Sequence, residues 1–160
     1  MGANSRRTQS LQARIAVMTP ESILDHLEYP WDEVEGASSG ERITMAGEPS
    51  TPPGVLTRLA GDGDRWVRER VASNPSTPLA VLALLAGDES QYVRCSVAEN
   101  HSTPPEVLTR LAEDVDQYVR CSVASNPSTP PELLAELSRD RNRYMRTAAV
   151  HNLSRRGLSA

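Results

Sequence analysis

The segment SNPSTPPELLAEL, residues 125–137, decides the fold of this chain because its first half recurs at a fixed interval. Residues 73–78 read SNPSTP, and residues 99–104 and 47–52 read ENHSTP and GEPSTP. The threonines of these four copies lie 26 residues apart, at Thr51, Thr77, Thr103 and Thr129. A strict period of this length is typical of proteins built from stacked structural repeats.

The first half of each period has the pattern of a short helix. Its threonine is a natural N-cap, and the proline after it suits the first helical position, where no amide partner is needed. Thr103 and Thr129 are each followed three residues later by glutamate, which predicts a capping box. Apolar residues then follow at the i, i+1, i+4 spacing of one helix face. They are Val55, Leu56 and Leu59; Val81, Leu82 and Leu85; Val107, Leu108 and Leu111; and Leu133, Leu134 and Leu137.

The second half of each period predicts another helix. Good N-cap residues recur at Asp64, Ser90, Asp116 and Asn142. Apolar pairs spaced i, i+4 follow, namely Val67/Val71, Val93/Val97, Val119/Val123 and Met145/Ala149. We expect the asparagines at 74, 100, 126 and 152 to end this helix, since asparagine tolerates the left-handed conformation found there.

One repeat has too few aliphatic residues to form a core alone, so the repeats must stack. The sequence predicts an all-α fold, a short α-solenoid of about five two-helix repeats. We divide the chain into an N-terminal extension, flexible or capping (1–17), a degenerate capping repeat with an acidic insertion (18–49), four regular repeats (50–153) and a C-terminal tail (154–160).

The composition points to a cytoplasmic protein. The chain of 160 residues has a net charge of −4, no apolar run long enough to span a membrane and no secretory signal. All its basic side chains are arginine, which is typical of a GC-rich bacterial genome. Residues 20–49 carry eight acids and one arginine, whereas residues 139–156 carry six arginines and one acid.

The repeat resembles a known family. Residues 118–140, YVRCSVASNPSTPPELLAELSRD, resemble the bacterial leucine-rich repeat variant family, and residues 111–124, LAEDVDQYVRCSVA, also resemble HEAT-like repeats. The resemblance implies a right-handed superhelix in which α-helices alternate with 3₁₀ or short α segments. We expect the proline-rich first helix to be the 3₁₀ one.

The family's founding architecture also implies an iron–sulfur cluster in a cysteine-rich N-terminal piece. Residues 1–50 contain no cysteine, and a cluster needs about four thiolate ligands. We therefore expect no cofactor. Cys95 and Cys121 occupy one position in adjacent repeats, where stacked helices lie too far apart for a disulfide. We expect two half-exposed thiols and no metal site.

Two charged positions recur through the repeats. An aspartate recurs at Asp62, Asp88, Asp114 and Asp140, and an arginine at Arg68, Arg94, Arg120 and Arg146, with Arg42 as a further member. As a binding strip, the arginines would hold phosphates or acidic side chains. The favoured interpretation is a structural ladder, in which each aspartate pairs with an arginine and with turn amides; HEAT-like repeats, which these resemble, use the same pair structurally.

An aromatic position is the best candidate for partner binding. It holds Trp66, Tyr92, Tyr118 and Tyr144, one residue before a buried apolar position. The rings either cover the seam between repeats or form a half-exposed row, and exposed aromatic rings dominate binding hot spots. Variable neighbours surround them, and the predicted partner-binding set adds Arg65, Arg70, Gln91 and Gln117.

Catalysis is not indicated. The three histidines are scattered, and the sequence has no phosphate-binding glycine loop and no nucleophile motif. We therefore predict a non-catalytic scaffold that binds another protein, as a monomer or weak homo-oligomer. One alternative is a nucleic-acid-binding solenoid that uses the arginines, although residues 51–160 balance 13 arginines with 13 acids. The other is head-to-tail self-assembly between the acidic and basic ends.

Overall fold

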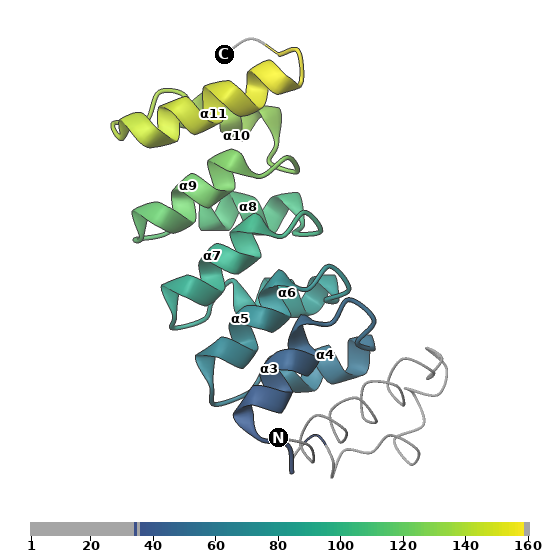
Figure 1. The fold of residues 1–160 in the computed structure, drawn as a ribbon. Coiled ribbons are helices and arrows are strands. Elements are labelled where there is room, and N and C mark those ends of the chain that lie inside the picture. The colour runs from purple at the N-terminus through teal and green to yellow at the C-terminus, as the bar shows by residue number, and fades with distance from the viewer. Residues whose placement is uncertain (1–33, 35, 159–160) are drawn as a thin grey trace. The chain divides into compact units, whose positions relative to one another are not determined.

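The structure is a computed structural model that describes residue 34 and residues 36–158, all of whose regular elements are helices. This part of the chain divides into two compact units at Val81/Leu82, inside α6 (Leu79–Leu85). The first unit contains α3 (Ser39–Gly47), α4 (Pro53–Leu59) and α5 (Arg65–Ser73). The second contains α7 (Gln91–Glu99), α8 (Pro105–Leu111), α9 (Gln117–Ser125), α10 (Pro131–Leu137) and α11 (Arg143–Arg155) (Figure 1). The predicted extension 1–17 and most of the degenerate repeat lie outside the described residues.

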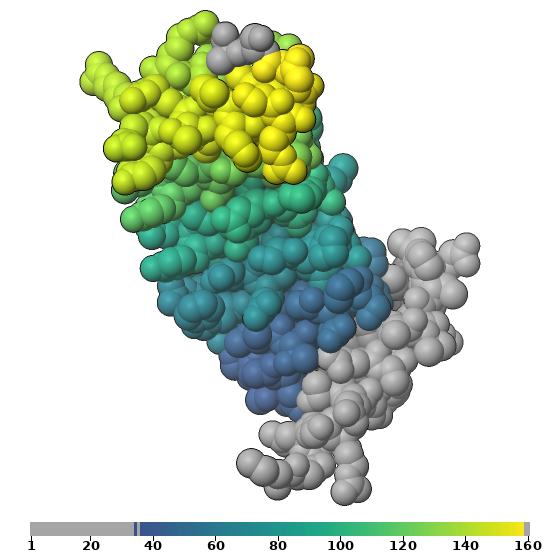
Figure 2. Space-filling view, turned by 45° about the horizontal axis from the view of Figure 1, so that its top comes forward, coloured from purple at the N-terminus to yellow at the C-terminus, as the bar shows by residue number. Residues whose placement is uncertain are grey.

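Each period forms one seven-residue and one longer helix, as the two start signals predicted. In the second unit, α7 packs on α9 and α9 packs on α11, with the short helices beside them. The space-filling view shows these repeats as successive bands from teal to yellow (Figure 2). None of the helices in the described ranges is long and apolar enough to cross a bilayer.

The proline-rich helices are α-helical, so the prediction of a 3₁₀ conformation for them is wrong. The amides of Leu56 and Ala60 donate to the carbonyls of Pro52 and Leu56, four residues earlier, and α8 repeats both bonds. The second proline of each Pro-Pro pair occupies the first turn, where its missing amide costs nothing. Each of these segments is therefore α-helical from its first residue, the second proline.

The repeated threonine is not the N-cap, contrary to the prediction. The N-cap of α4, α8 and α10 is the proline after it, and no side chain caps these helices. Each buried threonine hydroxyl instead donates to a carbonyl six residues earlier, at the end of the preceding helix, with Oγ1–O distances of 2.5–2.6 Å. The predicted capping boxes at Thr103 and Thr129 do not form; the described chain has one at Ser38 and Glu41.

The repeated asparagine ends helices α5, α7 and α9, but in an extended conformation. Asn74 has φ −73° and ψ 127°, and no described residue other than glycine has a positive φ. Asn126 Nδ2 donates to the carbonyls of Ala98 and Asn100 in the preceding repeat, at 2.7 and 3.0 Å. Its Oδ1 accepts from the amide of Ser128 at 2.7 Å. One side chain thus closes its own turn and joins two repeats.

The predicted apolar faces form the core. Leu56, Leu82 and Leu108 of the short helices are fully buried, as are Val67, Val93 and Val119 of the longer ones. The second helix starts as predicted: Asp64, Asp116 and Asn142 each accept a hydrogen bond from an amide in the first turn. Ser90 takes the same place without a side-chain bond.

The last helix departs from the pattern. Asn152 does not end α11, which continues to Arg155; Leu153 stands where Pro75, His101 and Pro127 follow the other asparagines. Gly157, with φ 70°, then turns the chain, and the guanidinium of Arg156 donates to the carbonyls of Thr129 and Pro127. The last regular helix therefore runs two residues into the predicted C-terminal tail.

Replacing Asn126 with alanine should lower the free energy of unfolding by about 2–4 kcal/mol, because three hydrogen bonds are lost and the buried carbonyl of Ala98 loses its Asn126 donor. Urea unfolding of the full chain, followed by circular dichroism, measures the change. Ser125→Ala, at the exposed neighbouring position, is the matched control and should change stability by less than about 0.5 kcal/mol. Equal losses in both variants would contradict this role.

Candidate protein-interaction surface

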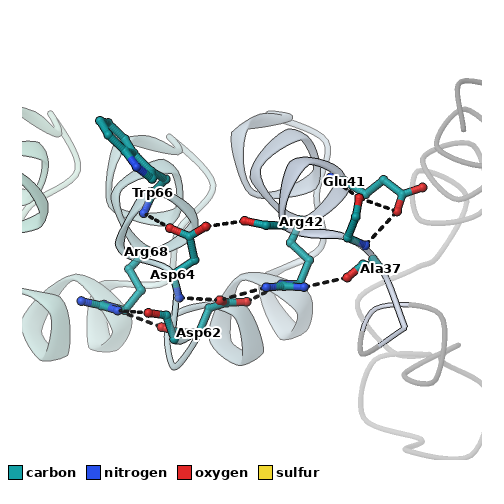
Figure 3. A network of polar contacts seen from close by, with 10 residues as sticks. Ala37, Glu41, Arg42, Asp62, Asp64, Trp66 and Arg68 are labelled. Carbon is teal, nitrogen blue, oxygen red and sulfur yellow. Dashed lines mark hydrogen bonds and ion pairs between the residues drawn. The ribbon is translucent and has the colours of Figure 1, made fainter.

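A network of arginine and aspartate connects the repeats of the first unit (Figure 3). Arg42 on α3 donates from Nε to Asp62 Oδ2 at 2.6 Å and from Nη1 to the carbonyl of Ala37 at 2.6 Å. Asp62 Oδ1 also accepts from the amide of Asp64 at 2.8 Å. From the following helix, Arg68 Nη1 donates to the carbonyl of Asp62 at 2.9 Å. The loop before α5 is thus held from both sides.

The same arrangement recurs in the second unit. Arg94 donates from Nε and Nη2 to the two carboxylate oxygens of Asp114, at 2.6 and 2.9 Å, and from Nη1 to the carbonyl of Asp88. The hydrogen bond to Asp114 raises the pKa of Arg94. Burial raises the pKa of Asp114, but the bonds from Arg94 and from the amide of Asp116 outweigh it and hold the pKa below its usual range. Arg94 is therefore engaged within the chain.

The remaining arginines of this position keep the loop contact. Arg120 Nη1 donates to the carbonyls of Asp114 and Val115, at 2.7 and 3.1 Å. Arg146 Nη1 donates to those of Asp140 and Arg141, both at 2.9 Å. Each of these guanidinium groups donates to carbonyls of its own loop. Fewer of their N–H donors are therefore available to phosphate or acidic groups than the sequence alone indicates.

The aromatic position is exposed in every repeat. Its exposed fractions are 50% for Trp66, 51% for Tyr92, 64% for Tyr118 and 71% for Tyr144. Each ring lies in the first turn of a long helix, directly after the N-cap and its neighbour. Within the second unit, α7, α9 and α11 present three tyrosines at equivalent positions on successively packed helices. These three rings and Trp66 of the first unit are called the aromatic positions below.

The predicted neighbours of the rings have different environments. The guanidinium carbon of Arg65 lies 4.4 Å from the centre of the Trp66 ring, which is a cation–π contact. Arg143 makes a similar contact with Tyr144 at 5.6 Å. Gln117 Oε1 accepts from Asn142 Nδ2 of the next repeat at 3.2 Å, whereas Gln91 is half-buried. Gln117 therefore links the starts of α9 and α11.

The residue four positions after each ring lies on the same face of the helix, and its environment differs between repeats. Arg70 is exposed, with its stem beside Gly47 of α3, and Ser96 is buried. Ser122 Oγ donates to Glu99 Oε1 of the preceding repeat at 3.0 Å. Arg70 therefore lies at the surface with the rings, while Ser96 belongs to the packing between helices.

The cysteines are free and half-buried. Burial raises the pKa of Cys95 to about 11 and, to a smaller extent, the pKa of Cys121. Because the thiolate is the nucleophile and metal ligand, the raised pKa values lower the reactivity of both side chains. Within the described ranges, no group of three or more histidine, cysteine or acidic residues could hold a metal ion.

Sequence reasoning missed a groove of about 500 Å³ in the second unit. His101, His151, Arg155 and Arg156 line it, beside the ends of α9 and α11. The sequence does not indicate this groove, because His101 and His151 occupy different repeat positions two repeats apart. The groove arises where α11 continues past Asn152, which the repeat pattern alone does not predict.

Three segments match the model of the family described as leucine rich repeat variant: residues 65–90, 93–116 and 119–142. No curated protein sequence matches the chain. Among solved structures, the chain is similar to one entitled "A leucine-rich repeat variant with a novel repetitive protein structural motif". The two share 26% identity, with a TM-score of 0.61, over 91% of this chain and 61% of that one. The chain thus spans less than two thirds of that protein, and the predicted all-α solenoid is confirmed.

Acidification should test the Asp114 contact. The folded-state pKa of Asp114 lies below the unfolded value, so its carboxylate stabilises the fold above about pH 3.9 and loses this effect as pH falls through the folded pKa. In Asp114→Asn, the free energy of unfolding should therefore fall less steeply with acidification below about pH 5. Urea unfolding at a series of pH values measures this slope. Glu113→Gln, at the exposed neighbouring position, should keep the wild-type slope; an Asp114→Asn slope equal to wild type would contradict the contact.

Proposed function

Because the chain belongs to the leucine rich repeat variant family, we propose that it is a non-catalytic scaffold that binds another protein through the aromatic positions. One observation carries the proposal: an aromatic ring recurs at a position that is at least half exposed in all four repeats. Core packing does not require a ring there, because the apolar residue that follows is the buried one. Exposed tyrosine and tryptophan are the side chains most enriched in binding hot spots.

The structural support of the rings by the helix starts and loops favours this proposal. Each ring lies in the first turn of a helix whose preceding loop is held by an arginine, and α5, α9 and α11 also have a side-chain N-cap. The base of the ring should therefore move little on binding. Tyrosine and tryptophan have only two side-chain torsions to order, which keeps the entropic cost of contact low. Arg65 and Arg143, lying over neighbouring rings, add polar donors at the edge of the surface. A partner would therefore meet a rigid aromatic surface with a polar border.

The nucleic-acid alternative has less support. A strip of arginines would need its guanidinium groups free for phosphates, but Arg42 and Arg94 pair with Asp62 and Asp114. The equal numbers of arginines and acids in residues 51–160 point the same way. Salt-dependent retention of nuclease-sensitive material by the chain would favour this alternative.

A triple variant, Tyr92→Ala/Tyr118→Ala/Tyr144→Ala, should keep its fold and lose its partner. The rings are exposed, so each change should alter stability by no more than about 0.5 kcal/mol. Loss of one hot-spot ring costs about 2 kcal/mol of binding free energy, so losing several should abolish retention. The measurement is an affinity pull-down from a bacterial lysate by the full chain, with circular dichroism to check folding.

The matched control is Leu84→Ala/Thr109→Ala/Val115→Ala, which removes exposed neutral side chains from the short helices and a loop. It should retain the same partner as the wild type. If the folded tyrosine variant still captures the partner that the control captures, the aromatic positions do not bind it.

A further inference from the structure

In the second unit, Arg120 and Arg146 hold the loops before their helices, and Arg94 binds a carboxylate as well. Arg42 and Arg94 each donate from Nε to an aspartate 20 residues later, in the following repeat, at 2.6 Å. Arg146 occupies the same position in α11 and is exposed. Its Nη1 makes the same loop contacts as Arg94, to the carbonyls six and five residues earlier. The loop thus fixes the guanidinium of Arg146 as in the inner repeats.

A cavity adjoins this guanidinium. It has a volume of about 520 Å³ and is lined by Ser138, Arg146, Thr147, Val150, His151 and Ser154. Val150 is 42% exposed there, while the alanines at the same repeat position, Ala72, Ala98 and Ala124, are fully buried. The surface therefore places the exposed apolar side chain of Val150 near the guanidinium of Arg146, which the loop holds in position.

A regular repeat cannot fill this place in full. Stacking requires an asparagine of the next repeat to donate to carbonyls at the end of the preceding long helix, as Asn126 does to Ala98 and Asn100. In α11 the corresponding carbonyl of Val150 lies inside the helix, which continues to Arg155, and it accepts from the amide four residues later. The carbonyl of Val150 is therefore engaged inside α11, while the guanidinium of Arg146 lies at the surface.

We propose that Arg146 and Val150 form a docking site for an acidic segment of a partner protein, whose carboxylate binds Arg146 as Asp62 and Asp114 bind Arg42 and Arg94. The site extends the proposed scaffold function to a second surface, which does not depend on the aromatic positions. Charge supports an acidic occupant, since residues 139–156 carry six arginines and one acid. The exposed Val150 favours a peptide over free phosphate, because a peptide can cover it with an aliphatic side chain.

The chain itself supplies a probe. Residues 111–125 contain the aspartate that pairs with Arg94 and the valines that follow it, so we would use this peptide with Cys121→Ser. A second peptide carrying Asp114→Asn keeps the same shape without the charge. The full chain, labelled with ¹⁵N, reports binding through the arginine Nε–H signals, and those of Arg42 and Arg94 are internal references for a paired guanidinium.

We expect the aspartate peptide to shift the Arg146 Nε–H signal and to slow its exchange with water towards the reference values. The asparagine peptide should bind about tenfold more weakly, the effect of losing one charge-assisted hydrogen bond. Arg146→Lys, which keeps the charge but loses the planar donor pair, should lose this preference for aspartate. Arg139→Gln should retain it, as should the variant without Tyr92, Tyr118 and Tyr144. Binding to that last variant separates this site from the aromatic positions.

Three results would overturn the proposal. One is an Arg146 signal unchanged by the aspartate peptide at its solubility limit or already protected in the free chain. Another is equal binding of the two peptides, and the third is an equal response to inorganic phosphate, which would show general attraction of anions. Concentration-dependent self-association abolished by Arg146→Lys would assign the surface to a second copy and would also overturn it.

Discussion

A buried asparagine amide joins α5, α9 and α11 to the preceding repeat of the same unit, and the rest of the structure depends on this contact. Asn74 and Asn126 use both Nδ2 hydrogens on carbonyls of the preceding repeat and use Oδ1 on their own turn. Aspartate has no such donors, and glutamine would place them one carbon further out. Because the partners lie 28 and 26 residues earlier, this side chain fixes the repeat length as well as the helix end.

The opposite end of the long helix is held by charge. Arg94 links its own loop to Asp114 of the next repeat, and Asp114 in turn accepts from the amide of Asp116, the N-cap of α9. The first turn of each long helix therefore has little freedom, although it lies at the surface. The aromatic positions occupy this turn, so the contacts that hold the repeats together also fix the rings.

The sequence predicted the helices and the core because these follow from local rules. Helix spacing, the N-caps at Asp64 and Asp116 and the buried leucines depend on residues within one turn. The family was likewise predicted correctly, since its pattern lies within one period. The errors concern side chains with partners outside that range. Thr129 is of a residue type that commonly caps helices, but its hydroxyl donates to the carbonyl of Val123. Asn126 is of a type that commonly ends helices in the left-handed conformation, but its side-chain amide donates to the carbonyl of Ala98.

The candidate surfaces divide in the same way. The sequence left open whether the rings cover the seam between repeats or are exposed, and the structure shows them at least half exposed. The groove at His101 and His151 depends on the continuation of α11. The environments of the arginines were the hardest to predict, because arginines at the same repeat position differ in their hydrogen-bond partners and in their exposure. Arg94 pairs with Asp114, and Arg146 at the same repeat position is exposed. Arg120 contacts its own loop although Asp140 follows it at the same spacing.

A repeat protein supplies its own comparison, because each position is occupied several times in nearly the same environment. Positions that face the core should repeat for packing, and the fully buried Val67, Val93 and Val119 do so. Exposed positions are free to vary, as Arg70 and Ser122 show. The aromatic positions break this rule: they are exposed and yet hold a large ring in each of the four regular repeats. Neither burial nor helix capping demands a ring there, and this repetition at an exposed position is the observation on which the proposed binding role rests.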